Sequence, residues 1–393
     1  MALALAGFAV LAGCQGCPAI FGECFDPDDP CPNDMVSDES GCVWDRCAGG
    51  FYGELVPCWH TERGAGVYTL AGSRGQYLAY QNGEVWVYDL ELEEHRRISP
   101  DSTHNCFDFL QTDGDRVAWL ETMEYEPKWV IDVYAADVAT GRQWHVPNPE
   151  SLYTSDFSIS GDSIALLERS DLVCDDMFEA TKRTLYLYDL ETEQKTLLID
   201  PDPEEHDVAA PSISGDRLVY WRATGRCSGR ARSEIWFMDL VTGEERMIDD
   251  LTNIWSPPVP CDYDYSFNGR WIVFWMGSSI VAYDVENGEK VEVTRCSIGD
   301  CHNFLEGGVV AFDRANEGGK IQRQVHLYEL DTGHSMQLTH LRPYYDVAEP
   351  RGMAGRRLLW SEFRGESIED ACGNERRATG RTMLLFWKDI EFD

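Results

Sequence analysis

The chain has 393 residues, and 43% of them are hydrophobic, which supports a sizeable core and excludes global disorder. Its 69 acidic and 33 basic residues give a net charge of −36, and such a surface repels nucleic-acid phosphates and anionic lipid headgroups. The charge suits a cationic partner, divalent ions or a salty exterior, although a surface kept soluble by carboxylates is the favoured explanation.

The N-terminus predicts export. Residues 2–13 form an uncharged apolar run that is too short to span a bilayer and is typical of a signal-peptide core. The run ends in "LAGC", which resembles a bacterial lipobox and implies an acylated N-terminus at Cys14 after cleavage of residues 1–13. Gln15 at the following position is similar to lipoproteins sent to the outer membrane, whereas the absence of any Lys or Arg before Arg46 departs from the usual signal. We therefore predict a lipid-anchored protein of the bacterial cell envelope, on its periplasmic or surface side, that contacts the membrane only through the lipid.

Residues 14–58 differ in composition from the rest of the chain. They are rich in Cys, Asp, Pro and Gly and show neither strand nor helix periodicity. The chain has fourteen cysteines, more than a reduced cytosolic protein without a metal pattern would carry. This segment is predicted to be a disulfide-held module or tether. Its "DPDDPCPND" stretch lacks the Gly and the terminal Glu of an EF-hand, so a solvated turn is favoured over a calcium loop.

Residues 59–393 contain a repeat. Each unit begins with a glycine turn followed by a short aromatic and β-branched run, such as "GDRLVYW" from Gly215 or "GRWIVFW" from Gly269. Successive turn glycines lie between 38 and 54 residues apart, a period typical of four-stranded propeller blades. Stacking such blades around an axis lets each apolar face cover that of its neighbour.

A recurring hairpin ends each unit. "IWFMDLVTGEERMI" from Ile235 is echoed by "LYLYDLETEQKTLLI", "IVAYDVENGEKVEVT" and "VHLYELDTGHSMQLT". Asp239 and Asp189 are expected to cap the turn. Gly243, Gly288 and Gly333 are expected to take its positive-φ position, which Glu193 occupies in the third unit.

These repeats, of the form "SISGDRLVYW…SEIWFMDLVTGEERMI", resemble the TolB-type, WD40-like β-propeller repeat over roughly residues 66–393. The family's "WSPDG" is replaced here by "SISGD", "SFNGR" and "LQTDGD". The resemblance implies an all-β protein with a single propeller of four-stranded blades and a protein or peptide partner in the envelope. Seven units can be counted, with six or eight blades left open. The last unit ends after its third strand, so residues 52–59, "YGELVPCW", are a candidate for the missing fourth strand.

The topology predicts two unlike faces. Tight turns join strands one to two and three to four of each blade, whereas the other connections, several of them long, emerge on what we call the long-connection face. We expect irregular loops there, at 121–128, 168–183, 222–233, 313–324 and 361–381. The seven cysteines of the propeller fall in these connections. Cys296 and Cys301 are candidates for a local disulfide, and Cys174 and Cys227 for one between adjacent blades. Their spacing suits structural staples better than a metal site.

The connections also bring polar groups to the expected channel mouth. The candidate ligand or cation site comprises Asp108, Asp156, Asp207, Asp264, Asp300, His302 and Asp346, with Tyr344 and Tyr345 as an exposed stacking pair. Carboxylates around an opening attract a cation or a basic peptide. Alternatively, each Asp caps its own turn.

No common catalytic motif was found: there is no G-x-S-x-G, H-E-x-x-H, phosphate loop or dinucleotide fingerprint. The sequence therefore favours a monomeric, non-catalytic binding platform that recognises a protein, peptide or cation, without a metal site and without a cofactor other than, as an open option, Ca²⁺. The alternative is a secreted hydrolase or lyase that acts on polysaccharide or peptide through its carboxylates and His302.

Overall fold

The computed structural model describes the parts of the chain that build the propeller and one short hairpin before it. The described residues are 35–38, 41–44, 68–71, 75–81, 84–99, 106–125, 128–146, 153–173, 179–201, 206–224, 232–250, 265–276, 279–295, 303–315, 323–339, 347–369 and 375–390. All regular structure in these ranges is β-strand or turn, and they contain no helix.

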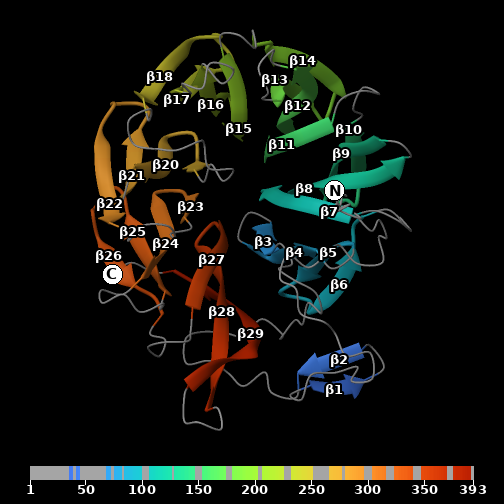
Figure 1. The fold of residues 1–393 in the computed structure, drawn as a ribbon, viewed down its shortest axis with the longest axis vertical. Coiled ribbons are helices and arrows are strands. Elements are labelled where there is room, and N and C mark those ends of the chain that lie inside the picture. The colour runs from blue at the N-terminus through green and yellow to red at the C-terminus, as the bar shows by residue number, and fades with distance from the viewer. Residues whose placement is uncertain are drawn as a thin grey trace, which may run out of the picture.

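Seven antiparallel blades form a ring (Figure 1). Blade 1 contains β3 (Tyr68–Ala71), β4 (Tyr77–Gln81), β5 (Val85–Asp89) and β6 (Glu94–Arg97). Blade 2 contains β7 (Cys106–Asp113), β8 (Arg116–Tyr125), β9 (Lys128–Asp137) and β10 (Gln143–Val146). Blade 3 contains β11 (Tyr153–Ser160), β12 (Ser163–Val173), β13 (Glu179–Asp189) and β14 (Gln194–Ile199). Blade 4 contains β15 (His206–Ser214), β16 (Arg217–Thr224), β17 (Arg232–Asp239) and β18 (Glu245–Asp250). Blade 5 contains β19 (Tyr265–Phe267), β20 (Trp271–Met276), β21 (Ser279–Asp284) and β22 (Lys290–Arg295). Blade 6 contains β23 (Asn303–Glu306), β24 (Val309–Ala315), β25 (Arg323–Glu329) and β26 (Ser335–Gln337).

Blade 7 shows three described strands, β27 (Val347–Ala354), β28 (Arg357–Glu369) and β29 (Glu375–Asp389). A single parallel bridge, Arg323 to Val347, links it to blade 6. Residues 52–59, the candidate fourth strand, lie outside the described residues. The predicted all-β propeller is confirmed, with seven as the blade count.

The Cys-rich segment corrects one expectation. It contains a hairpin of β1 (Met35–Asp38) and β2 (Gly41–Trp44), although no strand periodicity was found there. Four-residue strands are too short to display the alternation on which that analysis relied.

The ring closes between blades 7 and 1. Arg357 of β28 donates from Nη1 to the carbonyl oxygen of Gly75, at 3.3 Å, in the turn before β4. A Cβ atom at Gly75 would lie 3.2 Å from Cβ of Arg357, so the two blades are in close contact. The first and last repeats therefore adjoin, as a closed propeller requires.

The core lies in the seams between blades. Val219 and Phe237 of blade 4 pack against Phe267 and Phe274 of blade 5. Because successive strand residues point to opposite sheet faces, each blade contributes to two such seams. A buried Phe or Val contributes roughly 1.5–3 kcal/mol, so the seams supply most of the stability of the ring. Large strand aromatics such as Trp119, Trp221 and Phe274 are thus core residues.

The hairpin turns follow their predicted chemistry. Asp239 accepts hydrogen bonds at Oδ1 from the backbone N–H groups of Val241 and Thr242, at 3.0 and 2.8 Å. Gly243 has φ 72°, and Asp189 caps the equivalent turn of blade 3 in the same way. Glu193 takes the glycine position there with φ 57°. The blade 3 turn therefore holds a side chain in a conformation that favours glycine.

Replacing Glu193 by glycine is expected to raise the free energy of unfolding by about 0.5–1 kcal/mol. Glycine adopts the positive φ of this position without strain, and this gain exceeds the loss from the greater backbone entropy of glycine in the unfolded chain. The Arg142 ion pair that is lost spans 3.8 Å between two side chains that are more than half exposed, and contributes little. Gly243→Ala is the matched control, since a Cβ there meets no atom within 4 Å and tests only φ. Urea denaturation should show a higher free energy of unfolding for Glu193→Gly and a lower one for Gly243→Ala. A change of the same sign in both variants would show that Glu193 is not strained.

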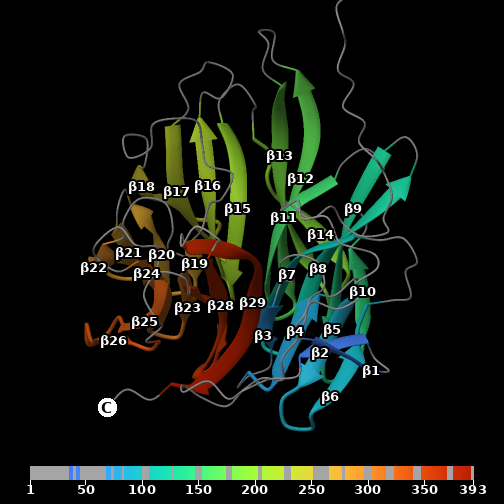
Figure 2. The ribbon, with the colours of Figure 1, turned by 60° about the horizontal axis from the view of Figure 1, so that its bottom comes forward.

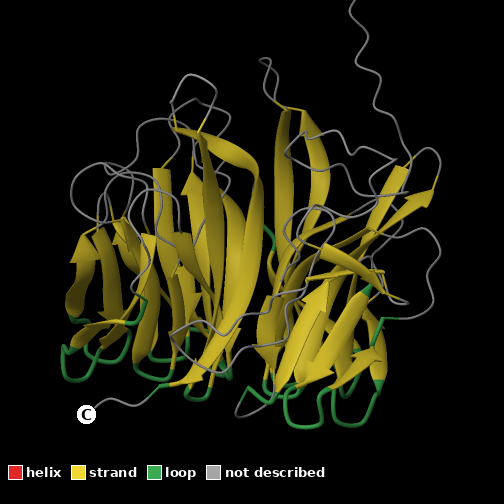
Figure 3. Cartoon of the chain, turned by 90° about the horizontal axis from the view of Figure 1, so that it is seen from below, coloured by secondary structure: helices red, strands yellow, loops and turns green. Residues whose placement is uncertain are grey.

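The two faces of the ring differ as predicted. The described turns lie together on one face, and the strand ends that lead into the longer connections point to the other (Figure 3). The prediction that these connections are irregular loops was wrong, because much of their described length is paired strand. β8 runs to Tyr125 and β9 begins at Lys128, while β12 and β13 stay in register from Ser163–Asp189 to Val173–Glu179.

The β12–β13 and β28–β29 hairpins consequently project as long arms (Figure 2). Continued pairing satisfies backbone groups that a loop would leave to solvent. Cys106 was also expected in a connection, but it is the first residue of β7.

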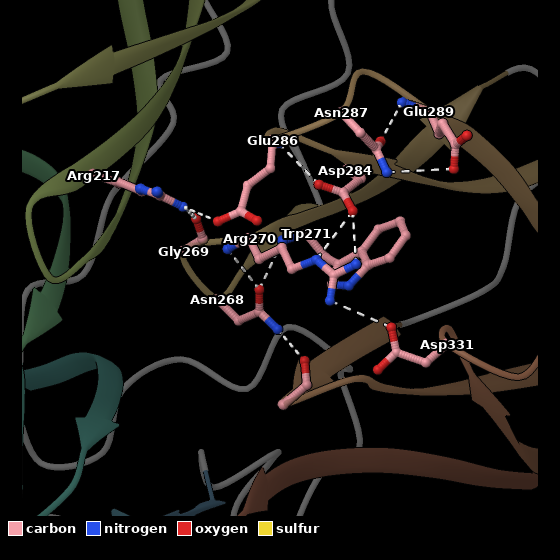
Figure 4. A network of polar contacts seen from close by, with 11 residues as sticks. Arg217, Asn268, Gly269, Arg270, Trp271, Asp284, Glu286, Asn287, Glu289 and Asp331 are labelled. Carbon is pink, nitrogen blue, oxygen red and sulfur yellow. Dashed lines mark hydrogen bonds and ion pairs between the residues drawn. The ribbon is translucent and has the colours of Figure 1, made fainter.

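Ion pairs tie the blades together on the tight-turn face (Figure 4). Arg270 of blade 5 donates to Oδ2 of Asp284 from Nη2 and Nε, at 2.9 and 3.0 Å, and its Nη1 lies 3.4 Å from Asp331 of blade 6. Arg217 of blade 4 donates to the carbonyl of Gly269 at 2.6 Å. Arginines at the start of the second strand of other blades bridge similarly; they are Arg116, paired with Asp137 and Asp162, and Arg357. The described arginines of this face therefore join neighbouring blades.

Candidate functional site

The innermost strands are irregular in the half that lies nearer the long-connection face. Register shifts interrupt β7 between Asp108 and Gln111, β11 between Thr154 and Asp156, and β27 between Pro350 and Gly352. β15 is shifted between Ala209 and Ser212, and Ala210 within it has φ 45°. Bulges of this kind redirect side chains and are common beside binding sites.

An acidic pair meets one arginine between blades 3 and 4. Asp207 of β15 is 6% exposed, and its Oδ1 accepts hydrogen bonds from the N–H groups of Val208 and Arg183, at 2.9 and 3.2 Å. The Arg183 side chain, from β13, places Nε 4.0 Å from Oδ2 of Asp207. Its charge also acts on Asp156, on the innermost strand of its own blade. Arg183 therefore serves carboxylates from two neighbouring blades.

Asp156 is the most perturbed carboxyl group here. Desolvation by burial raises its pKa to about 7, although the Phe157 N–H, 2.9 Å from Oδ1, and the Arg183 charge both lower it. The residue nevertheless keeps some exposure to solvent. A carboxyl group that is half ionised at neutral pH and still accessible is poised to respond to an incoming charge.

Tyr265 adjoins this group from blade 5. Its hydroxyl donates to the carbonyl oxygens of Ala210 and Val219, the latter at 2.9 Å. Burial, and then the Asp156 charge, raise its pKa well above the usual value, so the phenol stays neutral. Tyr265 thus anchors the bulge of β15 and is not a source of protons.

A second arginine–carboxylate group lies between blades 6 and 7. Arg323 of β25 donates from Nη1 to Asp313 at 3.3 Å and to Glu349 of β27 at 3.2 Å. Arg351, in the bulge of β27, donates to Oε2 of Glu349 and to Oγ of Ser361, both at 2.8 Å. The same device therefore occurs twice, with a third-strand arginine reaching a carboxylate on the innermost strand of the next blade.

The candidate residues fare unevenly. The structure brings Asp156 and Asp207 together on Arg183, and each accepts the backbone N–H of the residue that follows it in its strand. Asp108 is the third residue of β7. The other candidates lie outside the described residues; they are Asp264, Asp300, His302, Asp346, Tyr344 and Tyr345, with Cys14, Cys174, Cys227, Cys296 and Cys301.

Sequence reasoning missed Arg183, Arg323 and Arg351. The signal available for the first two was a basic residue at the end of a long connection, where the third strand resumes. In the described ranges no three His, Cys, Asp or Glu side chains are placed to hold a metal ion. No helix long and apolar enough to cross a membrane was found in those ranges either.

Comparison with known proteins supports the fold and leaves the activity open. No protein-family model and no curated protein matches the chain. Similar solved structures include a prolyl endopeptidase with TM-score 0.52 and 10% identity, over 81% of this chain and 50% of that chain. TolB from Acinetobacter baumannii matches with TM-score 0.40 and 15% identity, over 71% and 64%. An oligogalacturonate lyase in complex with manganese matches with TM-score 0.46 and 10% identity, over 82% and 90%.

At these identities the likeness shows the β-propeller fold alone, and that fold, which the TolB-type repeat implied, is confirmed. The chain spans less than two thirds of the matched TolB chain and half of the matched endopeptidase.

Proposed function

We propose that this protein is a non-catalytic binding platform of the bacterial cell envelope, anchored through a lipid at Cys14. Its long-connection face would recognise a protein or peptide through a cationic group. The observation that carries the proposal is Asp156, a carboxyl group on an innermost strand where desolvation opposes its ionisation. A cation arriving beside it would stabilise the charged form and would itself be bound.

The surroundings of Asp156 suit this role. Asp207 and Arg183 form a fixed pair beside it, which adds little net charge and leaves Asp156 as the group that responds. The net charge of −36 attracts cations at long range and accelerates encounter. The tight-turn face, by contrast, uses its arginines and carboxylates to join blades.

The test is the pH dependence of binding to a lysine-rich peptide, measured by calorimetry on the intact protein. With a pKa of about 7 the ionised fraction of Asp156 rises roughly tenfold between pH 6 and pH 8, so affinity should rise about tenfold. Asp156→Asn should bind weakly at both pH values. Asp216→Asn, which removes the same charge from an exposed turn on the opposite face, should retain the wild-type rise.

Equal weakening in both variants would reduce the effect to net charge and overturn the proposal.

The same carboxyl group favours one second candidate, because a pKa near the working pH suits a general acid or base. A hydrolase or lyase would show turnover of a polysaccharide or peptide substrate that Asp156→Asn abolishes with the fold intact. A binding platform would show none.

A further inference from the structure

The edge of blade 2 holds two buried carboxylates under one imidazole. Glu121 of β8 and Asp132 of β9 are cross-strand partners and are 1% and 5% exposed. His145 of β10 lies with Nε2 2.8 Å from Oδ2 of Asp132. Glu121 shares the sheet face of Trp119, two residues before it, and that face packs against blade 1.

The imidazole is held in place by stacking. His145 stacks on Tyr134, with ring centres 4.7 Å apart and planes at 19°, and Tyr134 stacks on Trp119 at 6.0 Å. The side chain of His145 is still 46% exposed, so protons reach it freely.

The neighbouring elements bring few other charges. Blade 1 packs Val85, Val87 and Ile98 into this seam. Its two arginines have partners of their own: Arg96 donates to the carbonyl of Val138, and Arg97 pairs with Glu84 at 2.9 Å. The charged groups that act on His145 are therefore Asp132 and Glu121.

We propose that β10 is a pH-dependent latch on blade 2: the protonated imidazole of His145 clamps this four-residue strand to the two buried carboxylates, and loss of the proton loosens it. Blade 3 provides the contrast. Its buried Glu168, 2% exposed, pairs with Lys195 of the outermost strand β14, so a lysine stands there in place of the imidazole. Of these two blades, blade 2 is the one that pairs its buried carboxylates with an imidazole, a group that titrates near neutral pH.

The sign follows from the surroundings. The hydrogen bond that the His145 imidazole donates to Asp132 raises the pKa of His145 above 6.5, with burial opposing it and the charges of Asp132 and Glu121 adding to it. A raised folded-state pKa stabilises below pH 6.5, and the stabilisation is lost as pH rises through the folded value. Burial raises the pKa of Glu121 too, so ionising this carboxyl costs stability in the same direction as pH rises. The latch is therefore closed in mild acid and loosened above neutrality.

The latch itself stands on the blade 2 contacts and does not depend on the proposed function.

Hydrogen exchange of the intact protein, read by mass spectrometry at pH 6 and pH 8 and corrected for the intrinsic pH dependence, tests the latch. Protection of the β10 amides should fall about tenfold for each unit by which the folded-state pKa of His145 exceeds its ordinary value, whereas β14 of blade 3 should stay unchanged. His145→Lys should keep β10 protected at both pH values, and His145→Gln should leave it loosened at both.

Equal protection of wild-type β10 at the two pH values would overturn the latch, as would a pH dependence in His145→Lys as large as that of the wild type. Lys195→His provides a second route should the blade 2 variants fold poorly. It should give β14 the pH dependence that β10 has in the wild type, and a β14 that remains insensitive would count against the mechanism.

Discussion

Replacing Asp156 by asparagine should stabilise the folded protein at pH 8 by up to about 4 kcal/mol. The pKa of this carboxyl group is about 7 in the folded chain and about 3.9 in an unfolded one, and each unit of difference corresponds to about 1.4 kcal/mol. Above pH 7 the wild type bears the full cost of an ionised group in a desolvated place. Asparagine keeps the shape without the charge.

The pH window distinguishes this from a general gain in packing. Below about pH 4 Asp156 is protonated in both the folded and the unfolded state, so the advantage of asparagine should vanish there and grow as pH rises from 4 to 7. Urea denaturation at several pH values gives the comparison. Asp207→Asn is the matched control and should destabilise, because Asp207 is paired with Arg183. A pH-independent gain, or a loss at pH 8, would show that desolvation does not govern Asp156.

Asp284→Ala should lower the free energy of unfolding by about 2–3 kcal/mol at neutral pH. Asp284 is 1% exposed, accepts two hydrogen bonds from Arg270 at 2.9 and 3.0 Å, and accepts the N–H of Glu286 at 2.8 Å. Alanine would remove a buried acceptor and leave the Glu286 N–H and the partly exposed Arg270 guanidinium without it.

The pH profile and a control make this prediction specific. Burial raises the pKa of Asp284, but the Glu286 N–H and the Arg270 guanidinium outweigh burial and lower it overall. The stabilisation is therefore present above pH 4 and should be lost as pH falls through the lowered value. Asp331→Ala removes a 62% exposed partner at 3.4 Å from the same arginine and should change stability by less than about 1 kcal/mol. Similar losses in the two variants would mean that the inter-blade contact, and not the buried carboxylate, dominates.

The fold was predictable because its determinants are local and repeated. The turn glycines and the Asp caps of the hairpins act within four residues, so their chemistry can be read from short stretches such as 235–248. Even the exception at Glu193 was visible, since the repeat marks where glycine is missing. Seven copies of the same signal then fix the architecture.

The hairpin arms and the arginine bridges were not predictable in this way. Residues 168–173 and 179–183 are mostly polar and lack the alternation of a half-buried strand, so their pairing depends on the opposite strand. Arg183 reaches Asp207 across a blade boundary, a contact set by how two blades are packed. A single sequence does not carry that information. The buried position of Asp156 likewise depends on surroundings drawn from several blades.

The arms of blades 3 and 7 have a consequence for how this face can change. The β12 and β13 strands stay in register beyond the ring, whereas β28 and β29 shift register between Gly365 and Ser367. Antiparallel strands that are in register can gain or lose residues in cross-strand pairs at their free end. Such insertions or deletions do not change which sheet face each remaining side chain points to. The packing of the ring is therefore unaffected by the length of the arm. The length of a hairpin arm on the long-connection face can therefore evolve independently of the ring of blades that supports it.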